Sequence, residues 1–408
     1  MRLLSRATFA AFVLFGLTGC LNSGQQQAAC SLASTWTVAD EFRYDRDTEA
    51  TGIAIDGRGT IYVAGAATTA NRSSWLVRAS GDQGAKWVYS DVSNATIADA
   101  RPRAILSTSI GVLVSGEMGI AGAGGWLTRR IGTEGWVNED VANMIAGTSG
   151  ITGLAQADDG TILASGFGGG NGARWIVRVR DGVNGGWTGY GVDTVDAGTI
   201  VDAGRAAGVA AGSGAWIVVG GDRIRTTAGL QGRWVVRRSA DRGASWTSTD
   251  LGTGGLRTQA RAAAMGRDGI FYVAGTVEDA TGRAHWTVRR STNYGYTWET
   301  TDDYLPEVGL AQPNTIAVGG DGTVWVGGTV GSLNGDRWIV RRGGGKLTSW
   351  TTAEEFLATG HSSAAVNGIA FGNDGAVYAA GRSSVIGQGV RWIVRKLPCL
   401  AAATSGSR

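Results

Sequence analysis

The chain alternates short apolar runs with turns that contain glycine. Near the N-terminus, apolar residues fill 52–56 and 60–65 on either side of the turn 57–59, and further runs follow at 74–78 and 87–90. Runs of this length between glycine turns predict β-strands joined by hairpins, because glycine supplies the positive φ that tight turns require. Near-continuous apolar character predicts sheets that are buried on both faces. We therefore expect a unit of four antiparallel strands.

This unit recurs along the chain. A tetrad of the form Trp-x-(Val/Thr)-Arg marks the third strand of each copy, and successive tetrads are 49 to 59 residues apart. The seven tetrads are Trp75–Arg78, Trp126–Arg129, Trp175–Arg178, Trp234–Arg237, Trp286–Arg289, Trp338–Arg341 and Trp392–Arg395. A repeat of this length made of short strands predicts a closed ring. The fold class we expect is all-β: a seven-bladed β-propeller with four-stranded antiparallel blades.

The two ends of the chain predict how the ring closes. The last repeat has three strands, and the segment 34–42 near the N-terminus matches 349–356, the outer strand of the preceding repeat. We expect this N-terminal strand to complete the last blade. In the same alignment Cys30 and Cys399 fall at neighbouring positions of one turn. We predict a disulfide between them, since an exported protein meets an oxidising compartment.

The first residues indicate export. Two arginines lie in 1–6, an apolar run fills 7–17, and Leu17-Thr18-Gly19-Cys20 follows; this is the pattern of a secretory signal. The tetrapeptide resembles the lipobox of bacterial lipoproteins, which implies that Cys20 carries the lipid anchor. In that family, Leu21 after the cysteine implies the outer membrane of a Gram-negative cell, or otherwise the cell surface. A signal peptide that ends at a cysteine by coincidence is the alternative.

These observations divide the chain. We expect a lipoprotein signal peptide at 1–19, the lipidated cysteine with its tether at 20–29, the propeller at 30–399 and a disordered tail at 400–408. The chain has 68 glycines and only 4 prolines, which suits strands and tight turns. A formal net charge of +3 gives no reason to expect a nucleic-acid partner. We expect the protein to contact the membrane through its lipid alone, to be a monomer and to bind no cofactor.

The turn between the third and fourth strands resembles the Asp-box, Ser-x-Asp-x-Gly-x-x-Trp, of sialidases and other bacterial neuraminidase repeat proteins. Two copies are complete and a third has Asn in place of Asp: Ser80, Asp82, Gly84, Trp87; Ser239, Asp241, Gly243, Trp246; and Ser291, Asn293, Gly295, Trp298. The carboxylate of such a turn caps backbone N–H groups. The resemblance implies that these turns lie opposite the ligand face, so we assign them a structural role.

Residues that recur in every blade are expected to have a structural role. A specific ligand site should instead contain residues that are present in some blades only. On this argument the tetrad arginines are structural. Basic residues before the tetrad Trp (Arg174, Arg233, His285, Arg337, Arg391) are expected to pair across the hairpin with acids of the outer strand (Asp40, Asp250, Asp302, Glu354). Near the innermost strands, Arg101 and Arg205 share one repeat position and Arg261 lies one residue on. We predict a ligand site for an anion at these three arginines; solvated rim arginines are the alternative.

Two functions fit this sequence. The first is a protein- or glycan-binding or scaffolding module, with its ligand on the loop face. The alternative is a sialidase-like or other glycan-cleaving enzyme. Against the sialidases, the Phe/Tyr-Arg-Ile-Pro motif of that family is absent and the expected ring has seven blades rather than six. Spacing selects no pair of catalytic carboxylates among the loop acids, and two histidines are too few for a His-rich metal site. We therefore name no catalytic residue and no metal ligand.

Overall fold

The computed structural model describes residues 31–400 apart from 45, 70–71, 94–98, 121–122, 144–148, 169–173, 183–184, 193–199, 213 and 346–348. The expected lipid site Cys20 and the expected disulfide partner Cys30 lie outside the described residues. Within them the secondary structure is β-strand throughout, and no helix has the length and apolar character needed to cross a bilayer.

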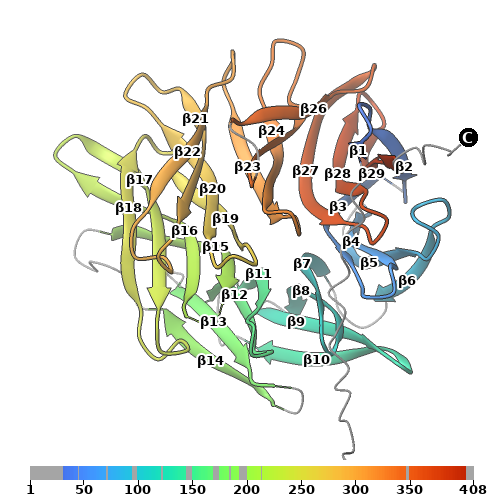
Figure 1. Cartoon of the computed structure of the whole chain (residues 1–408), viewed down its shortest axis with the longest axis horizontal. Coiled ribbons are helices and arrows are strands. Elements are labelled where there is room, and N and C mark those ends of the chain that lie inside the picture. Colours follow the sequence, from blue (N-terminus) through green and yellow to red (C-terminus); the bar gives the residue numbers. More distant parts are fainter. Residues whose placement is uncertain are drawn as a thin grey trace, which may run out of the picture.

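The strands form seven four-stranded antiparallel sheets that surround one centre (Figure 1). The first strand of each blade is innermost.

Blade one is β3 (Asp47–Ile55), β4 (Ile61–Thr68), β5 (Ser73–Ser80) and β6 (Val88–Ser93). Blade two is β7 (Asp99–Thr108), β8 (Gly111–Ile120), β9 (Ala123–Gly132) and β10 (Gly135–Asn143). Blade three is β11 (Gly150–Gln156), β12 (Ile162–Gly168), β13 (Arg174–Arg180) and β14 (Trp187–Val192). Blade four is β15 (Ile200–Ala211), β16 (Trp216–Thr226), β17 (Gly229–Ser239) and β18 (Thr247–Gly254). Blade five is β19 (Gln259–Met265), β20 (Phe271–Glu278), β21 (Ala284–Ser291) and β22 (Glu299–Tyr304). Blade six is β23 (Ala311–Val318), β24 (Thr323–Val330), β25 (Arg337–Gly344) and β26 (Thr351–Phe356).

The N-terminal strand closes the ring as the sequence predicts. Blade seven is β27 (His361–Phe371), β28 (Val377–Val385), β29 (Gly389–Leu397) and, outermost, β2 (Thr37–Phe42). A small extra sheet joins β1 (Ser31–Leu32) to β30 (Cys399–Leu400), with Leu32 opposite Cys399. The all-β propeller with an N-terminal strand in its last blade is therefore confirmed.

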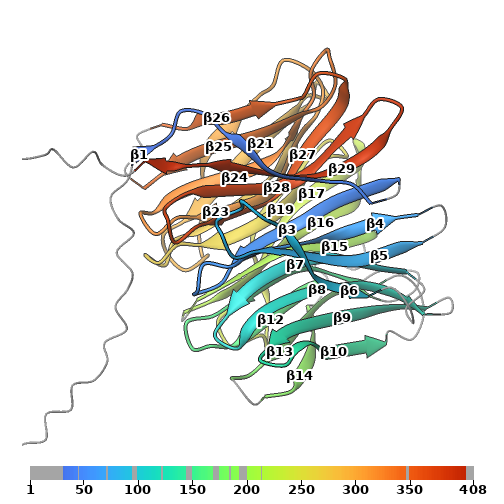
Figure 2. The same ribbon diagram turned by 90° about the vertical axis from the view of Figure 1, so that its right-hand side faces the viewer.

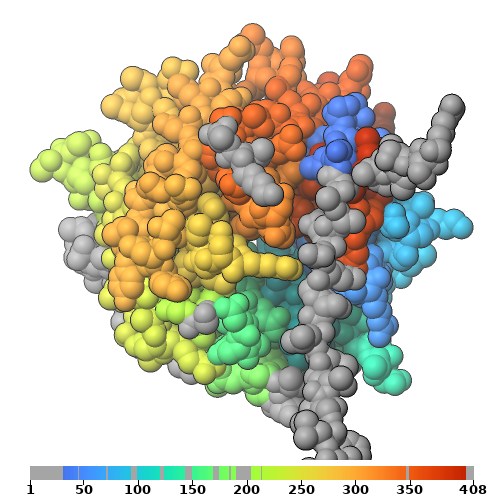
Figure 3. Space-filling model, viewed as in Figure 1, coloured from blue at the N-terminus to red at the C-terminus, as the bar shows by residue number. Residues whose placement is uncertain are grey.

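The ring has two distinct faces, seen edge-on in Figure 2. On the loop face, second strands connect to third strands, as between β4 and β5, and each blade connects to the next. On the opposite face, which we call the Asp-box face, third strands turn into fourth strands, and β1 lies beside it. The space-filling view shows the blades packed side by side around a hollowed centre (Figure 3).

Neighbouring blades pack through the tetrad tryptophans. The indole of Trp175 in blade three lies against Gly220 of blade four, where an added methyl group would come within 2.8 Å of the ring. Trp126 and Gly166 form the same contact between blades two and three. Six of the tetrad tryptophans are among the largest fully buried side chains of the described residues. In five blades the second-strand glycine is therefore confined on two sides: a side chain there would meet a backbone carbonyl of its own innermost strand and then the preceding blade's tryptophan. These glycines are Gly65, Gly166, Gly220, Gly275 and Gly381.

Ion pairs also join the blades, and here one expectation is wrong. The expected acids (Asp40, Asp250, Asp302 and Glu354) do not pair across their own hairpins; like Asp91 and Asp140, they pair with tetrad arginines of the following blade. The pairs are Arg78–Asp40, Arg129–Asp91, Arg178–Asp140, Arg289–Asp250, Arg341–Asp302 and Arg395–Glu354, at 2.5–2.9 Å. Three basic residues before the tetrad Trp do pair across the hairpin, with the outer-strand acid one residue after the expected one: Arg391 with Glu41, Arg337 with Glu355 and His285 with Asp303. Arg233 pairs instead with Asp222 of the second strand. The prediction was wrong by one position: successive side chains of a strand point to opposite sides, so the expected acid faces the next blade and the acid after it lies across the hairpin.

Candidate functional site

Every innermost strand carries a β-bulge at the same repeat position, where its pairing with the second strand shifts by one residue. A bulge leaves one extra residue outside the ladder and can aim its side chain toward a new environment. The extra residues, which we call the bulge ring, are Thr51, Arg103, Thr152, Ala207, Arg261, Asn314 and Asn367. All seven line the centre of the propeller.

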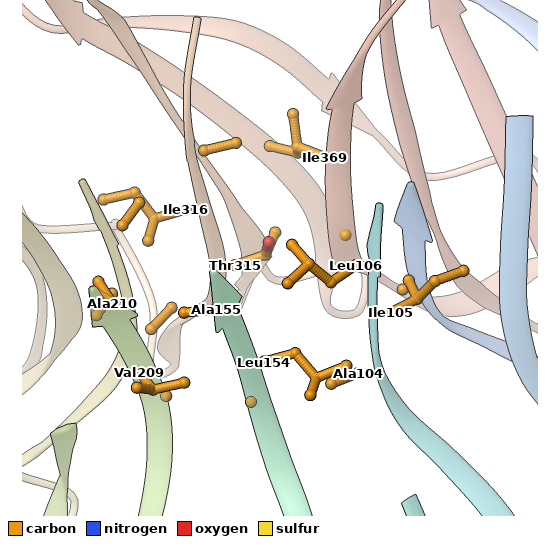
Figure 4. A pocket seen from close by; sticks show the side chains of 18 of the residues that line it. Ala104, Ile105, Leu106, Leu154, Ala155, Val209, Ala210, Thr315, Ile316 and Ile369 are labelled. Atoms are coloured by element: carbon orange, nitrogen blue, oxygen red, sulfur yellow. The ribbon is translucent and has the colours of Figure 1, made fainter. Parts of the chain in front are cut away.

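A central cavity of about 620 Å³ extends from the bulge ring toward the Asp-box face. Its walls are the bulge ring and the next four residues of each innermost strand, with Asp158, Gly266 and Arg267 at the far end. Among those four-residue stretches only Ser107, Gln156 and Thr315 have polar side chains. Figure 4 shows the side chains of Leu106, Leu154 and Ile316 around this space.

The cavity nevertheless offers polar partners through its backbone. Each innermost strand pairs with another strand on one side only. The other edge of such a strand keeps N–H and C=O groups that are not used in the sheet, and these strands line the cavity. The lining thus combines small apolar side chains with backbone donors and acceptors.

In three blades the bulge ring fastens one blade to the next. Thr152 donates to the carbonyl of Ala206 at 2.7 Å, Asn314 to that of Val366 at 3.0 Å, and Asn367 to that of Ala50 at 2.8 Å. Each acceptor directly precedes the bulge residue of the following blade. A fourth member, Thr51, donates within its own blade. The polar groups of these four side chains are therefore used in hydrogen bonds that stabilise the fold.

The remaining members of the ring break this pattern. Ala207 in blade four has no donor. Arg103 in blade two pairs with Glu117 at 2.5 Å, and both side chains are about a third exposed. Arg261 in blade five has no carboxylate within ion-pair distance among the described residues. When the side-chain amide of Gln259 is oriented with its oxygen toward Arg261, that oxygen accepts a hydrogen bond from the guanidinium at 2.6 Å. Burial lowers the pKa of Arg261 to about 10. A partly buried cation without a counter-ion attracts an anion.

The structure separates the three predicted ligand arginines. Arg101 and Arg205 do share a repeat position, two residues before the bulge, opposite Glu117 and Gly221. Neither lines the cavity, whereas Arg261 does. The expectation that Arg261 lies one residue on is wrong: it lies two residues on, at the bulge. Its true counterpart in blade two is Arg103, which the sequence reasoning missed because the first hairpin of blade five is one residue longer than those of blades two and four.

The two rim arginines have local partners. Nε of Arg101 donates to the hydroxyl of Ser73 at 2.7 Å. The guanidinium of Arg205 lies over the ring of Phe167, 4.2 Å from its centroid, and the residue remains exposed. Both contacts leave guanidinium donors available, because each arginine has five N–H groups. They can therefore support a ligand that is held at the cavity mouth.

The turns that resemble Asp-boxes lie on the opposite face and are internally hydrogen-bonded. In the first, Ser80 donates to Asp82 at 2.8 Å, and the N–H groups of Gly84 and Lys86 donate to Ser80 and Asp82 at 2.9 and 2.8 Å. Trp87 donates to the carbonyl of Gly84. The same network occurs at Ser239, Asp241, Gly243 and Trp246, and at Ser291, Asn293, Gly295 and Trp298. The polar groups of these side chains are therefore used in hydrogen bonds within their own turns.

Two histidines flank the loop face. His285 contacts Asp303 at 2.8 Å and Asp279 at 3.4 Å. Burial alone would lower the pKa of His285, but these hydrogen bonds outweigh it and raise the pKa. Burial, with Arg391 nearby, lowers the pKa of His361. The part of the chain that the structure describes contains no cluster of three or more His, Cys, Asp or Glu side chains suited to hold a metal ion.

Comparison with known proteins identifies the fold. No protein-family model matches the chain, and no curated protein matches it. A protein of unknown function from Dyadobacter fermentans is 13% identical, covering 89% of this chain and 99% of its own, with a TM-score of 0.50. A polysaccharide lyase of family PL25, an ulvan lyase, is 11% identical over 89% of this chain and 96% of its own, with a TM-score of 0.55. A Trypanosoma rangeli sialidase variant covers 91% of this chain and 60% of its own at 12% identity, with a TM-score of 0.48. At these identities the likeness shows a shared fold and nothing finer.

Proposed function

We propose that this protein is a binding module for acidic glycans, and that the glycan binds at the loop-face mouth of the central cavity. The observation that carries the proposal is Arg261, a partly buried guanidinium at the rim of a ligand-sized cavity, for which the described residues provide no carboxylate partner. Cavities of about 300–1,000 Å³ are typical of small-ligand sites. A guanidinium matches the planar geometry of a sugar carboxylate or sulfate.

The surroundings of Arg261 support this assignment. Arg101 and Arg205 come from two other blades at the level above the bulge ring and add positive charge near the opening. The cavity wall below offers apolar surface and free backbone groups, the two kinds of contact that a sugar ring needs. One solved ulvan lyase of similar fold, with a TM-score of 0.54, holds the acidic saccharide -[GlcA(1-4)Rha3S]-.

The second candidate is a glycan-cleaving enzyme. Glu117 favours it, because this carboxylate lies beside the same mouth and is held by Arg103 at 2.5 Å. A carboxylate next to a bound sugar is a candidate proton donor or acceptor. Hydrolysis by paired carboxylates needs a second acid within about 5–10 Å, and no such pair is apparent from the described contacts of Glu117. We therefore place binding before cleavage.

We also propose that Cys20 carries a lipid that anchors the protein to the outer membrane or the cell surface, and that Cys30 and Cys399 form a disulfide. The register of β1 with β30 supports the second point, since Ser31 lies opposite Leu400. Because β1 lies beside the Asp-box face, a tether leaving from it would direct the loop face away from the membrane.

One experiment separates the candidate functions. The purified full-length protein is applied to an array of acidic and neutral glycans and, in parallel, incubated with polysaccharides while reducing ends and unsaturated products are measured. Binding of acidic glycans without product supports the module. Steady product formation that Glu117→Gln abolishes would favour the enzyme, and absence of any glycan binding would refute both.

A further inference from the structure

We infer that the bulge ring receives a chain end: a terminal uronic acid, whose carboxylate binds Arg261 in the space left by Ala207. This inference rests on the proposed function and specifies which part of an acidic glycan is recognised. It follows from how blades four and five depart from the other blades.

The first step concerns space. Blade four lies between blades three and five, and their innermost strands β11, β15 and β19 are in contact. In blade three, Thr152 reaches the carbonyl of Ala206 and fills the gap to its neighbour. The equivalent side chain in blade four is the methyl group of Ala207, which cannot reach the carbonyl of Ala260. Ala207 and Arg261 both line the cavity, and the two strands approach closely here. The short side chain of Ala207 therefore leaves the cavity open directly beside the bulge of blade five, where Arg261 lies.

The second step concerns charge. Among the residues that the structure describes, no carboxylate pairs with Arg261, whereas Arg103 is already bound to Glu117. An acidic group is attracted to the Arg261 side and repelled from the Glu117 side. The ring can thus orient a sugar that has one carboxylate, with its hydroxyl groups toward Glu117 and the free backbone groups of the wall.

The third step concerns shape. Seven innermost strands enclose the cavity on all sides. A residue in the middle of a glycan chain has neighbours on both sides, so it cannot descend to the bulge ring without drawing both of them in. A terminal residue has one neighbour and can enter end-on while the rest of the chain leaves through the mouth past Arg101 and Arg205. The geometry therefore favours chain ends over internal residues.

Calorimetry on the full-length protein tests the choice of chain end. The probes are an oligosaccharide with glucuronate at its non-reducing end, the same oligosaccharide extended by one neutral sugar so that the glucuronate is internal, and free glucuronate. We expect the terminal form to bind at least tenfold more tightly than the extended form, and free glucuronate to compete with it. Equal affinity for the terminal and extended forms would overturn the inference while leaving the proposed function intact.

Two substitutions copied from other blades test the residues. Ala207→Thr reproduces Thr152, and Arg261→Asn reproduces Asn314 and Asn367, so each can add an inter-blade hydrogen bond. We expect both variants to keep or raise the melting temperature and to lose at least tenfold in affinity for the terminal probe. Ala207→Gly keeps the space open and is the matched control, with affinity near that of the wild type.

The outcomes are distinct. If Ala207→Thr binds the terminal probe as well as Ala207→Gly does, the space beside Arg261 is not the site. If Arg261→Asn lowers the melting temperature and leaves affinity unchanged, Arg261 serves the fold and the inference is wrong. If no acidic saccharide binds to the unmodified protein, the proposed function itself fails.

Discussion

Thr152 of blade three donates a hydrogen bond to the carbonyl of Ala206 in blade four, 2.7 Å away and 54 positions along the chain. The bond lies at the centre of the ring, where each blade contributes one bulged residue. Its equivalents at Asn314 and Asn367 show that this position joins adjacent blades in three of the seven cases. A blade with a different residue at this position lacks the inter-blade hydrogen bond, so that residue is a candidate for a functional role.

The mouth arginines and the tetrad arginines should respond oppositely to mutation. Arg261→Ala, Arg101→Ala and Arg205→Ala are expected to weaken binding of an acidic glycan, with the largest loss at Arg261, and to change the melting temperature little. Arg237→Ala should lower the melting temperature instead. Calorimetry at rising salt provides a further check, because exposed charges are screened within about 8–10 Å at ordinary ionic strength. Loss of binding in the tetrad variant alone would show that the wrong arginines were chosen.

The buried ion pairs between blades should matter more than exposed pairs within a blade. Arg341 holds Asp302 through two hydrogen bonds of 2.8 and 2.7 Å, and both side chains are less than a tenth exposed. Arg341→Met leaves a buried, unpaired carboxylate, which should lower the free energy of unfolding by about 3–5 kcal/mol. Arg290→Met removes an exposed pair with Glu299 and should cost about 1 kcal/mol or less. Denaturant unfolding of both variants measures the difference; equal losses would contradict it.

The two histidines should titrate on opposite sides of the ordinary histidine value. The pKa of His285 is raised by Asp303 and Asp279, and that of His361 is lowered by burial. The stabilisation from His285 is therefore present below its unfolded pKa and is lost as pH rises through its folded pKa. NMR titration of the two imidazole signals tests this, with His361→Gln to assign them. The reverse order of the two pKa values would contradict the described contacts.

The lipid anchor is tested by Cys20→Ala. We expect the variant to leave the membrane fraction and to lose labelling by a palmitate analogue, because stable anchoring needs the acyl chains of that cysteine. Cys399→Ala is the matched control and should remain in the membrane. If Cys20→Ala also remains there and is still labelled, the lipobox resemblance has misled us.

The disulfide is tested by peptide mapping without reductant. A crosslink between the peptides of Cys30 and Cys399 is expected. Closing so long a loop stabilises the fold by about 4–5 kcal/mol in chain-entropy treatments, so the reduced protein should unfold at a lower denaturant concentration. Alkylation of both thiols in the folded, oxidised protein would contradict the bond.

Periodic features were predictable from the sequence because they repeat. The spacing of the Trp-x-(Val/Thr)-Arg tetrads predicts the blades, and the match between 34–42 and 349–356 predicts the strand that closes the ring. Both follow from local patterns of apolar residues. Neither required knowledge of which side chains meet across the ring.

The centre was less predictable, for two physical reasons. Residues paired across the first hairpin are one position further apart in blade five than in blades two and four, as Gln259–Thr276 against Arg101–Glu117 and Arg205–Gly221 show. Simple spacing therefore places Arg261 one residue from its true position and conceals Arg103. Contacts between blades, such as Arg78 with Asp40, join residues that no hairpin brings together. Their partners become evident only when the angle between adjacent sheets is known.

The place of β2 in blade seven has a consequence for how the protein is made. Phe42, near the start of the chain, pairs with Trp392, near its end. This early strand must therefore wait, without its partner, until almost all of the chain has been synthesised. Contacts between such distant residues form slowly, and an unpaired strand edge invites association with other chains. Completion of the last blade is thus the folding step at which the chain is most exposed to association with other chains.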